Sequence, residues 1–249
     1  MGMTRYLITV LVVIFLSHSA YADSNDLSAF PSRLFSDAND TFTKPGNLAA
    51  LLLAGGASVA MHNTDADRNV DDNLHRRAFD DTTDKIFDYA GNPWTHLGAT
   101  GLWYLFSQAN EDELNQKRAE SLLSALLITD ATIFTLKVIR NNDTPNGKDL
   151  AWPSGHTASS FCVASVLDEY YGPQVGVPAY IGACLVGWRM MDSGDHWASD
   201  VLFGGTLGYV VGHTVAGKHK QLEIAGFKIQ PMIDFGANPV TGISLVKRF

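Results

Sequence analysis

The longest helical pattern of this 249-residue chain covers residues 112–140, and it constrains the fold more than any other feature. Its apolar side chains recur at spacings of three and four, as they do along one face of an α-helix. They are Leu122, Leu123, Leu126, Leu127, Ile133, Leu136 and Ile139. Further helical patterns cover residues 46–61, 81–90, 93–106, 155–171, 176–191 and 197–216. Together these stretches, of which 81–90 is only a short helix, predict an all-α fold, a bundle of about six helices.

The first 22 residues have the features of a secretory signal peptide. Arg5 supplies a positive charge, a short apolar run follows, and Ala20-Tyr21-Ala22 is typical of a cleavage site. The mature chain is therefore expected to begin near Asp23 and to be exported, most simply to a bacterial periplasm. Residues 23–44 are polar and turn-rich, and we expect an extended lead-in there.

Residues 45–220 form the predicted helical domain. Within it, residues 62–84 are acidic and are expected to be irregular. The last residues, 221–249, change to a strand-like pattern, which predicts a short β-hairpin of two strands over 222–235 and 241–249.

Composition limits the partners of the chain. The net charge of −8 argues against nucleic acid, which requires a basic face, but a local site can still oppose the global sign and bind phosphate. After the signal peptide, no stretch reaches the ~18 uncharged apolar residues of a membrane span. The sequence therefore predicts a soluble exported protein and leaves peripheral membrane contact open.

Two cysteines, Cys162 and Cys184, lie in apolar helical stretches. In an oxidising compartment they could pair. Their positions slightly favour two small buried thiols instead.

Two short motifs carry the candidate chemistry. Residues 153–156 read Pro-Ser-Gly-His directly before a helical stretch, and the free N–H groups at a helix N-terminus can bind an anion. His196 and Asp200 are four residues apart, so they share one helical face. Asp200 can then hold one ring nitrogen while the other attacks. These residue types and spacings suggest phosphoryl transfer through a phosphohistidine without a metal.

The motifs resemble those of the type-2 phosphatidic acid phosphatase and vanadium haloperoxidase superfamily over roughly residues 95–215. Its signature is Lys-x6-Arg-Pro, then Pro-Ser-Gly-His, then Ser-Arg-x5-His-x3-Asp. This chain has the middle block intact, but Thr144 stands at the first arginine and Met190 at the second, with Arg189 one position early. The resemblance implies a helical bundle like that of acid phosphatases and haloperoxidases.

The resemblance also assigns catalytic roles. His196 is expected to be the nucleophile, and Asp200 to fix its tautomer and stabilise the imidazolium. His156 is expected to donate a proton to the leaving oxygen and then to activate water. Neither a metal nor another cofactor is implied.

Phosphate oxygens are expected to be held by Ser154, by the backbone of Gly155 and by the charge of Lys137. Because the two motif arginines are replaced, another cation is needed to balance the phosphate. Arg189 is the first candidate because it lies nearest the lost position, and Arg140 is the second.

Three functions remain open at this point. The leading hypothesis is an exported phosphatase that hydrolyses a phosphomonoester or a diphosphate, with an envelope lipid phosphate as a candidate substrate. A second is a catalytically weakened or inactive relative that binds an anion or a lipid phosphate. The third, a vanadate-dependent haloperoxidase, is disfavoured because tight oxyanion binding there requires the lost arginines.

Overall fold

The computed structural model describes residues 30–74, 77–220, 222–224, 227–234 and 240–246. The predicted signal peptide lies outside these residues. The described part contains nine helices, where the sequence suggested about six. They are α3 (Phe30–Thr43), α4 (Pro45–His62), α5 (Ala66–Leu74), α6 (Asp81–Gly91), α7 (Pro93–Ala109), α8 (Glu113–Arg140), α9 (Gly155–Tyr171), α10 (Pro173–Asp192) and α11 (Ala198–His219). The prediction of an all-α bundle is confirmed for this helical part.

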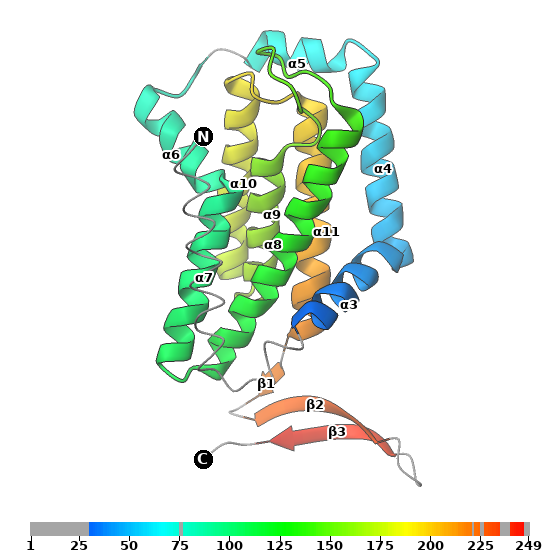
Figure 1. Ribbon diagram of the computed structural model, residues 1–249, viewed down its shortest axis with the longest axis vertical. Coiled ribbons are helices and arrows are strands. Elements are labelled where there is room, and N and C mark those ends of the chain that lie inside the picture. The colour runs from blue at the N-terminus through cyan, green and yellow to red at the C-terminus, as the bar shows by residue number, and fades with distance from the viewer. Residues whose placement is uncertain (1–29, 75–76, 221, 225–226, 235–239, 247–249) are drawn as a thin grey trace.

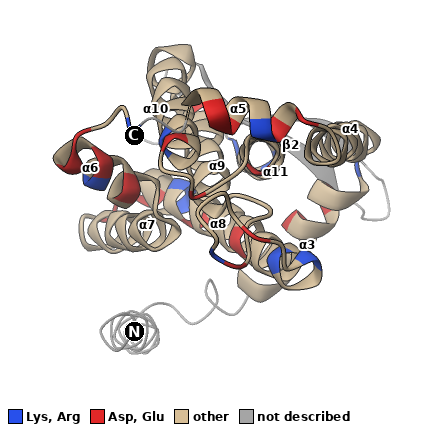
Figure 2. Cartoon of the chain, turned by 90° about the horizontal axis from the view of Figure 1, so that it is seen from above, with Lys and Arg blue, Asp and Glu red and all other residues tan. Residues whose placement is uncertain are grey.

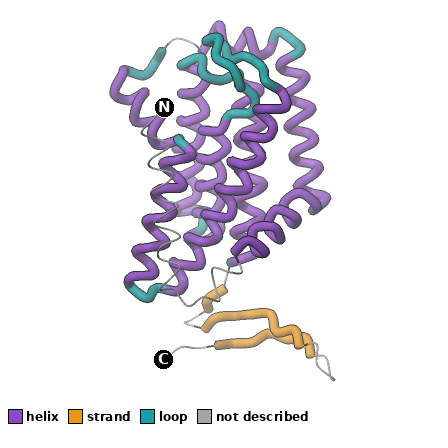
Figure 3. The backbone as a smooth tube through the Cα atoms, viewed as in Figure 1, coloured by secondary structure: helices purple, strands orange, loops and turns teal. Residues whose placement is uncertain are grey.

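Most helices run along the long axis of the molecule (Figure 1). α9 and α11 lie at the centre, with α8 beside them, α4 on one side and α6 and α7 on the other. The core between them contains fully buried side chains from α8, α9 and α11, among them Leu126, Val166 and Val211. The loops before α9 and before α11 lie at the same end of the bundle (Figure 3).

Small residues allow α9 and α11 to approach closely. Gly204, Gly208 and Gly212 recur every four residues and so share one face of α11. A Cβ atom added at Gly204 would lie 2.5 Å from the carbonyl oxygen of Ser154, and one added at Gly212 would lie 2.6 Å from that of Cys162. The backbones of the two helices are therefore in contact, which fixes the start of α9 against α11.

The expected extended lead-in over residues 23–44 is wrong from Phe30 onward, where helix α3 forms. Leu34, Ala38 and Phe42 recur every four residues and pack on the core. The buried Asp37 accepts hydrogen bonds from Ser124 of α8 and pairs with Lys218 and His219 of α11. Tertiary contacts thus outweigh the polar composition that suggested an extended segment.

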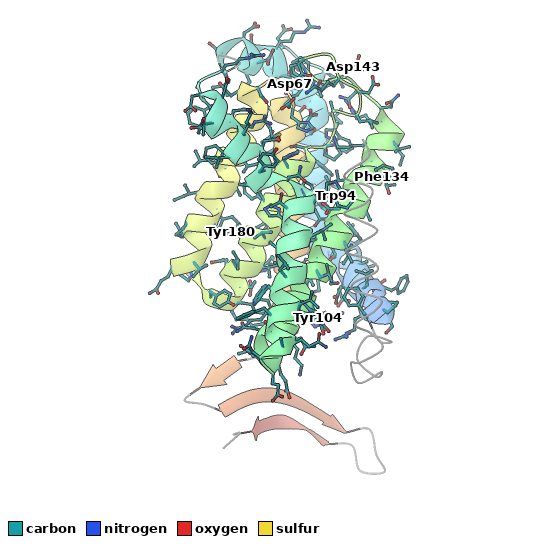
Figure 4. The ribbon with its side chains drawn as sticks, turned by 60° about the vertical axis from the view of Figure 1, so that its left-hand side comes forward. Asp67, Trp94, Tyr104, Phe134, Asp143 and Tyr180 are labelled. Atoms are coloured by element: carbon teal, nitrogen blue, oxygen red, sulfur yellow. The ribbon has the colours of Figure 1, made fainter. Side chains whose placement is uncertain are left out.

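The acidic segment 62–84 is also more ordered than expected. Helix α5 covers Ala66–Leu74, and its Asp67 is buried. The carboxylate of Asp67 accepts hydrogen bonds from the backbone N–H and the hydroxyl of Ser199, at 2.9 and 2.6 Å. α5 therefore holds the beginning of α11, and Asp67 lies at the end of the bundle that also contains Asp143 (Figure 4).

The described residues contain two free cysteines: Cys162 is buried in α9, and Cys184 is exposed on α10. Both lie in helices, as the sequence indicated. The expectation of two buried thiols is wrong for Cys184, whose helix turns it outward.

Three strands follow α11, where the sequence predicted two. β1 (Leu222–Ile224), β2 (Phe227–Asp234) and β3 (Val240–Val246) form an antiparallel sheet in the order β1-β2-β3. β2 and β3 pair from Lys228 opposite Val246 to Asp234 opposite Val240. The long strand expected over 222–235 is divided because the chain reverses between β1 and β2, which pair with each other.

Helix α8 is long and apolar enough to cross a membrane by length and composition, with a mean hydropathy of 1.8 over an 18-residue window. Among the described helices it alone meets this criterion. The sequence expectation differed because it required an uncharged run, which Asp130 interrupts. About 39% of that window is buried inside the bundle, so α8 also serves as a core helix.

Candidate active site

The Pro-Ser-Gly-His segment lies at the N-terminus of α9, as its sequence suggested. Ser154 is the N-cap residue: its hydroxyl accepts the backbone N–H of Thr157 at 3.4 Å and lies 2.9 Å from the Thr157 hydroxyl. The backbone N–H of Ser154 donates to the carbonyl of Asp200 at 3.1 Å. The N-terminus of α9 is therefore tied directly to α11.

His196 lies in the turn between α10 and α11, where its side chain is buried. Its Nδ1 is 3.4 Å from Oδ2 of Asp200, which also accepts the backbone N–H of Trp197 at 2.9 Å. With Nδ1 facing this carboxylate, Nε2 is the nitrogen left to act on a substrate.

The surroundings of His196 favour a neutral ring. Burial lowers its pKa, the hydrogen bond that its Nδ1 donates to Asp200 opposes this, and the charge of Lys137 lowers the pKa further. A neutral imidazole carries the lone pair that a nucleophile needs, so His196 is suited to attack at neutral pH.

Lys137 projects from the last turns of α8 toward the loop that precedes α9. Its ammonium donates to the carbonyl of Leu150 and, at 3.2 Å, to that of Ala151. Burial lowers its pKa to about 8, although the charge of Asp200 works against this shift. Lys137 thus lies within electrostatic reach of the His196–Asp200 pair and also fixes the loop.

His156 occupies the first turn of α9, with a side chain that is 25% exposed. Its Nε2 lies 3.4 Å from Oδ1 of Asp88 on α6, without the alignment of a hydrogen bond. Burial lowers the pKa of His156 to about 4; Asp88 raises it, while His196 and Arg189 lower it. His196 therefore lies within electrostatic reach of His156.

Arg189, the first candidate for a phosphate-binding cation, lies in the last turn of α10. Its side chain is 8% exposed and is surrounded by carboxylates. Nε and Nη2 donate to the two oxygens of Asp84 at 2.7 and 2.9 Å, and Nη1 donates to Asp88 at 3.1 Å and to Asp195 at 2.8 Å. These acids pair with its guanidinium, so Arg189 ties α6 to α10, and its role in phosphate binding stays a prediction.

Arg140 is the other candidate cation, and α8 ends with it. Asn141 follows in the left-handed conformation at φ 43°, so the helix does not continue toward Thr144. The guanidinium of Arg140 lies over the ring of Trp152, 5.6 Å from its centroid, and its buried Nε has no hydrogen-bond partner among the described residues. Arg140 therefore keeps a charge that no carboxylate in the described chain neutralises at close range.

The two positions that lost an arginine have structural roles. The hydroxyl of Thr144 accepts the backbone N–H of Lys148 at 2.9 Å and closes a tight loop. Met190 is buried in the core, with Sδ 3.9 Å from Nη1 of Arg189. Neither side chain supplies charge to the site.

Asp84, Asp88 and Asp195 were not predicted from the sequence. Asp84 and Asp88 are four residues apart on α6, whose acidic character is visible in Figure 2. The sequence could have indicated them, because Asp84 and Asp88 share a helical face and Asp195 directly precedes His196. What the sequence did not reveal was the arginine that these three residues contact. A polar cavity of about 290 Å³ opens beside the cluster and is lined in part by Asp84, Arg189 and Asp195.

We expect Arg189→Ala to lower the stability of the protein more than its affinity for phosphate. The substitution leaves three like-charged carboxylates facing one another, and removing one partner of a buried ion pair costs about 3 kcal/mol or more, less for partly exposed partners. Urea unfolding and phosphate titration of the variant would measure the two effects. Lys148→Ala, which removes an exposed cation from the same cluster, is the control and should cost under about 1 kcal/mol. A stable Arg189→Ala protein with sharply weakened phosphate binding would instead support the predicted role of Arg189 in binding phosphate.

Residues 132–222, which include all of these motif residues, match the family model described as the PAP2 superfamily. A lipid A 1-phosphatase of Porphyromonas gingivalis is 40% identical over 65 residues. That stretch makes up 25% of this chain and only 15% of the relative, so most of the relative's length has no counterpart in the match.

Two solved structures resemble the helical part. The transmembrane PAP2 type phosphatidylglycerolphosphate phosphatase from Bacillus subtilis aligns with a TM-score of 0.56 and 18% identity, covering 69% of this chain and 94% of that one. Aquifex aeolicus LpxE aligns with a TM-score of 0.48 and 20% identity, covering 57% and 90%. The first likeness shows a shared fold.

Proposed function

We propose that this chain, which belongs to the PAP2 superfamily over residues 132–222, is a metal-independent phosphatase that works through a phosphohistidine. The observation that carries the proposal is the arrangement around His196. Its Nδ1 faces Asp200 at 3.4 Å, and the backbone N–H of Ser154 at the start of α9 donates to the carbonyl of Asp200. The charge of Lys137 acts on His196, and His196 acts on His156.

The reaction takes place in two steps. Nε2 of His196 attacks phosphorus, the bond to the leaving oxygen breaks, and His156 gives that oxygen a proton. His156, now neutral, then takes a proton from water, whose oxygen displaces His196 and releases inorganic phosphate. Asp200 stabilises the positive ring of His196 through both steps. Because the pKa of His156 is about 4 in the free protein, the negative charge of the phosphate itself is needed to protonate it.

The charge balance of the site predicts a slow enzyme. Arg189 and Lys148 are outnumbered by Asp84, Asp88 and Asp195, so this cluster has a net charge of −1. Lys137, the N-terminus of α9 and Arg140, for which the described residues supply no acid partner, remain to stabilise the phosphate. Losing one preorganised donor typically costs ~10²–10³ in rate.

A lipid phosphate is the substrate class that we propose, and the surface of the bundle supports it. Trp94, Phe106, Phe134 and Ile139 on the neighbouring helices α7 and α8 are all more than half exposed. Trp94 and Phe134 are visible along the side of the bundle in Figure 4. Exposed apolar side chains on adjacent helices suit contact with a lipid surface. Export through residues 1–22 would bring the protein to an envelope membrane.

The test is phosphate release in EDTA from a lipid phosphate in vesicles and from a soluble aryl phosphate. We expect metal-independent hydrolysis that vanadate inhibits, with the lipid preferred. Equal rates on both substrates would remove the lipid assignment. Dependence on added metal would contradict the mechanism. A protein that binds phosphate or vanadate and hydrolyses neither substrate would instead be the non-catalytic binding relative.

A further inference from the structure

We propose that Asp88 is a positioning residue that orients His156, and that Arg189 holds Asp88 in place for this purpose. The inference rests on the proposed function, because it gives His156 the role of proton donor. It also assigns a role to Arg189, which lies one position before the arginine of the family signature.

A single oxygen joins the three residues. Oδ1 of Asp88 lies 3.4 Å from Nε2 of His156 and 3.1 Å from Nη1 of Arg189. Asp88 therefore faces the histidine on one side and is fixed from the other. The histidine nitrogen would otherwise be buried without a partner, since no hydrogen bond reaches it from the described residues.

Arg189 is itself held rigidly. It forms a two-pronged contact with Asp84, one turn before Asp88 on α6, and it also binds Asp195. Paired contacts of this kind fix a guanidinium in both position and plane. α6 is thereby clamped to α10 and to the residue that precedes His196. Arg189 thus contacts both Asp88, which faces His156, and Asp195, which directly precedes His196.

The register of α10 explains why this arginine can act as a clamp. A shift of one residue on a helix rotates the side chain by ~100°. Met190 occupies the family position and points into the core, while Arg189 points toward α6. The departure from the family motif thus coincides with the contact of Arg189 to α6.

The charged and titratable groups that act on His156 define what Asp88 does electrostatically. They are Asp88 on α6, Arg189 on α10, and Asp195 and His196 in the turn before α11. From α8, the charge of Lys137 lowers the pKa of His196. On α7, Nδ1 of His96 is 2.7 Å from the hydroxyl of Ser159. Of these groups, Asp88 and Asp195 favour the protonated ring, and Asp88 is the one in ion-pair contact with it.

The sign of the effect follows directly. The carboxylate of Asp88 raises the pKa of His156, so Asp88→Asn lowers that pKa. Proton donation requires protonated His156, and activity therefore falls as pH rises through its pKa. In the variant this fall should occur at lower pH.

The experiment compares Asp88→Asn with Asp84→Asn. Both remove one acid from α6 that binds Arg189, but Asp84 makes no ion pair with His156 among the described contacts. We expect Asp88→Asn to reduce kcat by about 10-fold, with a smaller change in KM, and to move the descending limb of the kcat profile to lower pH. Asp84→Asn should lower the stability of the protein and leave the descending limb of the kcat profile at its wild-type pH. The same shift in both variants, or none in Asp88→Asn, would overturn the inference.

An NMR titration of His156, with its signal assigned by a His156→Gln variant, separates this inference from the proposed function. In the Asp88→Asn variant, His156 should titrate at lower pH than it does in the wild-type protein, even if no substrate is hydrolysed. An unchanged titration contradicts the inference whatever the activity. If Asp88→Asn does not fold, Asp88→Glu provides the test. It keeps the charge and should keep the titration near that of the wild type, while the displaced carboxylate lowers kcat. An unaltered kcat in that variant would rule out positioning.

Discussion

Replacing His196 with alanine should abolish phosphate release, lowering kcat/KM by about 10⁴-fold or more. The substitution removes the nitrogen that we propose forms the bond to phosphorus, and no neighbouring side chain can take its place. In the proposed mechanism His156 acts on the leaving oxygen, and burial lowers its pKa to about 4. Phosphate release from the preferred substrate, followed over hours with excess enzyme, would measure the residual rate.

His213→Ala is a matched control for this variant. His213 lies on α11, the helix that carries Asp200, but it is 53% exposed and pairs with Glu169 at 2.6 Å. We expect full activity from that variant. If His196→Ala kept a tenth or more of the wild-type rate, the phosphohistidine route would have to be abandoned.

Replacing Gly208 with alanine should destabilise the protein by about 3 kcal/mol, the upper end of the usual cost of overpacking. The added Cβ would overlap the carbonyl oxygen of Ala158 and would lie 2.8 Å from its carbonyl carbon and 2.9 Å from the amide nitrogen of Cys162. These neighbours are backbone atoms of α9, so they cannot move aside as a side chain would. Urea unfolding of the variant would measure the loss.

Gly182→Ala on α10 is the control for Gly208→Ala. A Cβ added there meets nothing within 4 Å, and alanine is favoured over glycine in a helix interior by about 1 kcal/mol. We therefore expect this variant to be as stable as the wild type or slightly more so. Equal stability of the two variants would mean that α9 and α11 do not touch as closely as described.

The same close contact links stability to the site. α9 begins at the Ser-Gly-His segment, and α11 carries Asp200 in its first turn. The hydrogen bond from Ser154 to Asp200 joins these two beginnings. A substitution that separates the helices, such as Gly208→Ala, should therefore also lower activity in the fraction that remains folded.

Local rules were enough to predict much of the bundle. The helix found over Glu113–Arg140 was predicted over 112–140 from apolar spacing, and α9 and α10 were predicted over 155–171 and 176–191. The facing of His196 and Asp200 was expected from a shared helical face. It is found, but His196 lies in the turn just before the N-cap of α11, outside the helix. In each case the determining interactions join residues close in the sequence.

Tertiary contacts decided the rest. The polar segment 30–43 is helical because Asp37 finds partners on α8 and α11, more than 80 residues away. Arg189 became a clamp because Asp84 and Asp88, about 100 residues earlier, were folded against it. The sequence by itself determined which residues could do chemistry and on which helices they lie. Which cation would be neutralised, and which carboxylate would face His156, depended on distances between helices that no local pattern encodes.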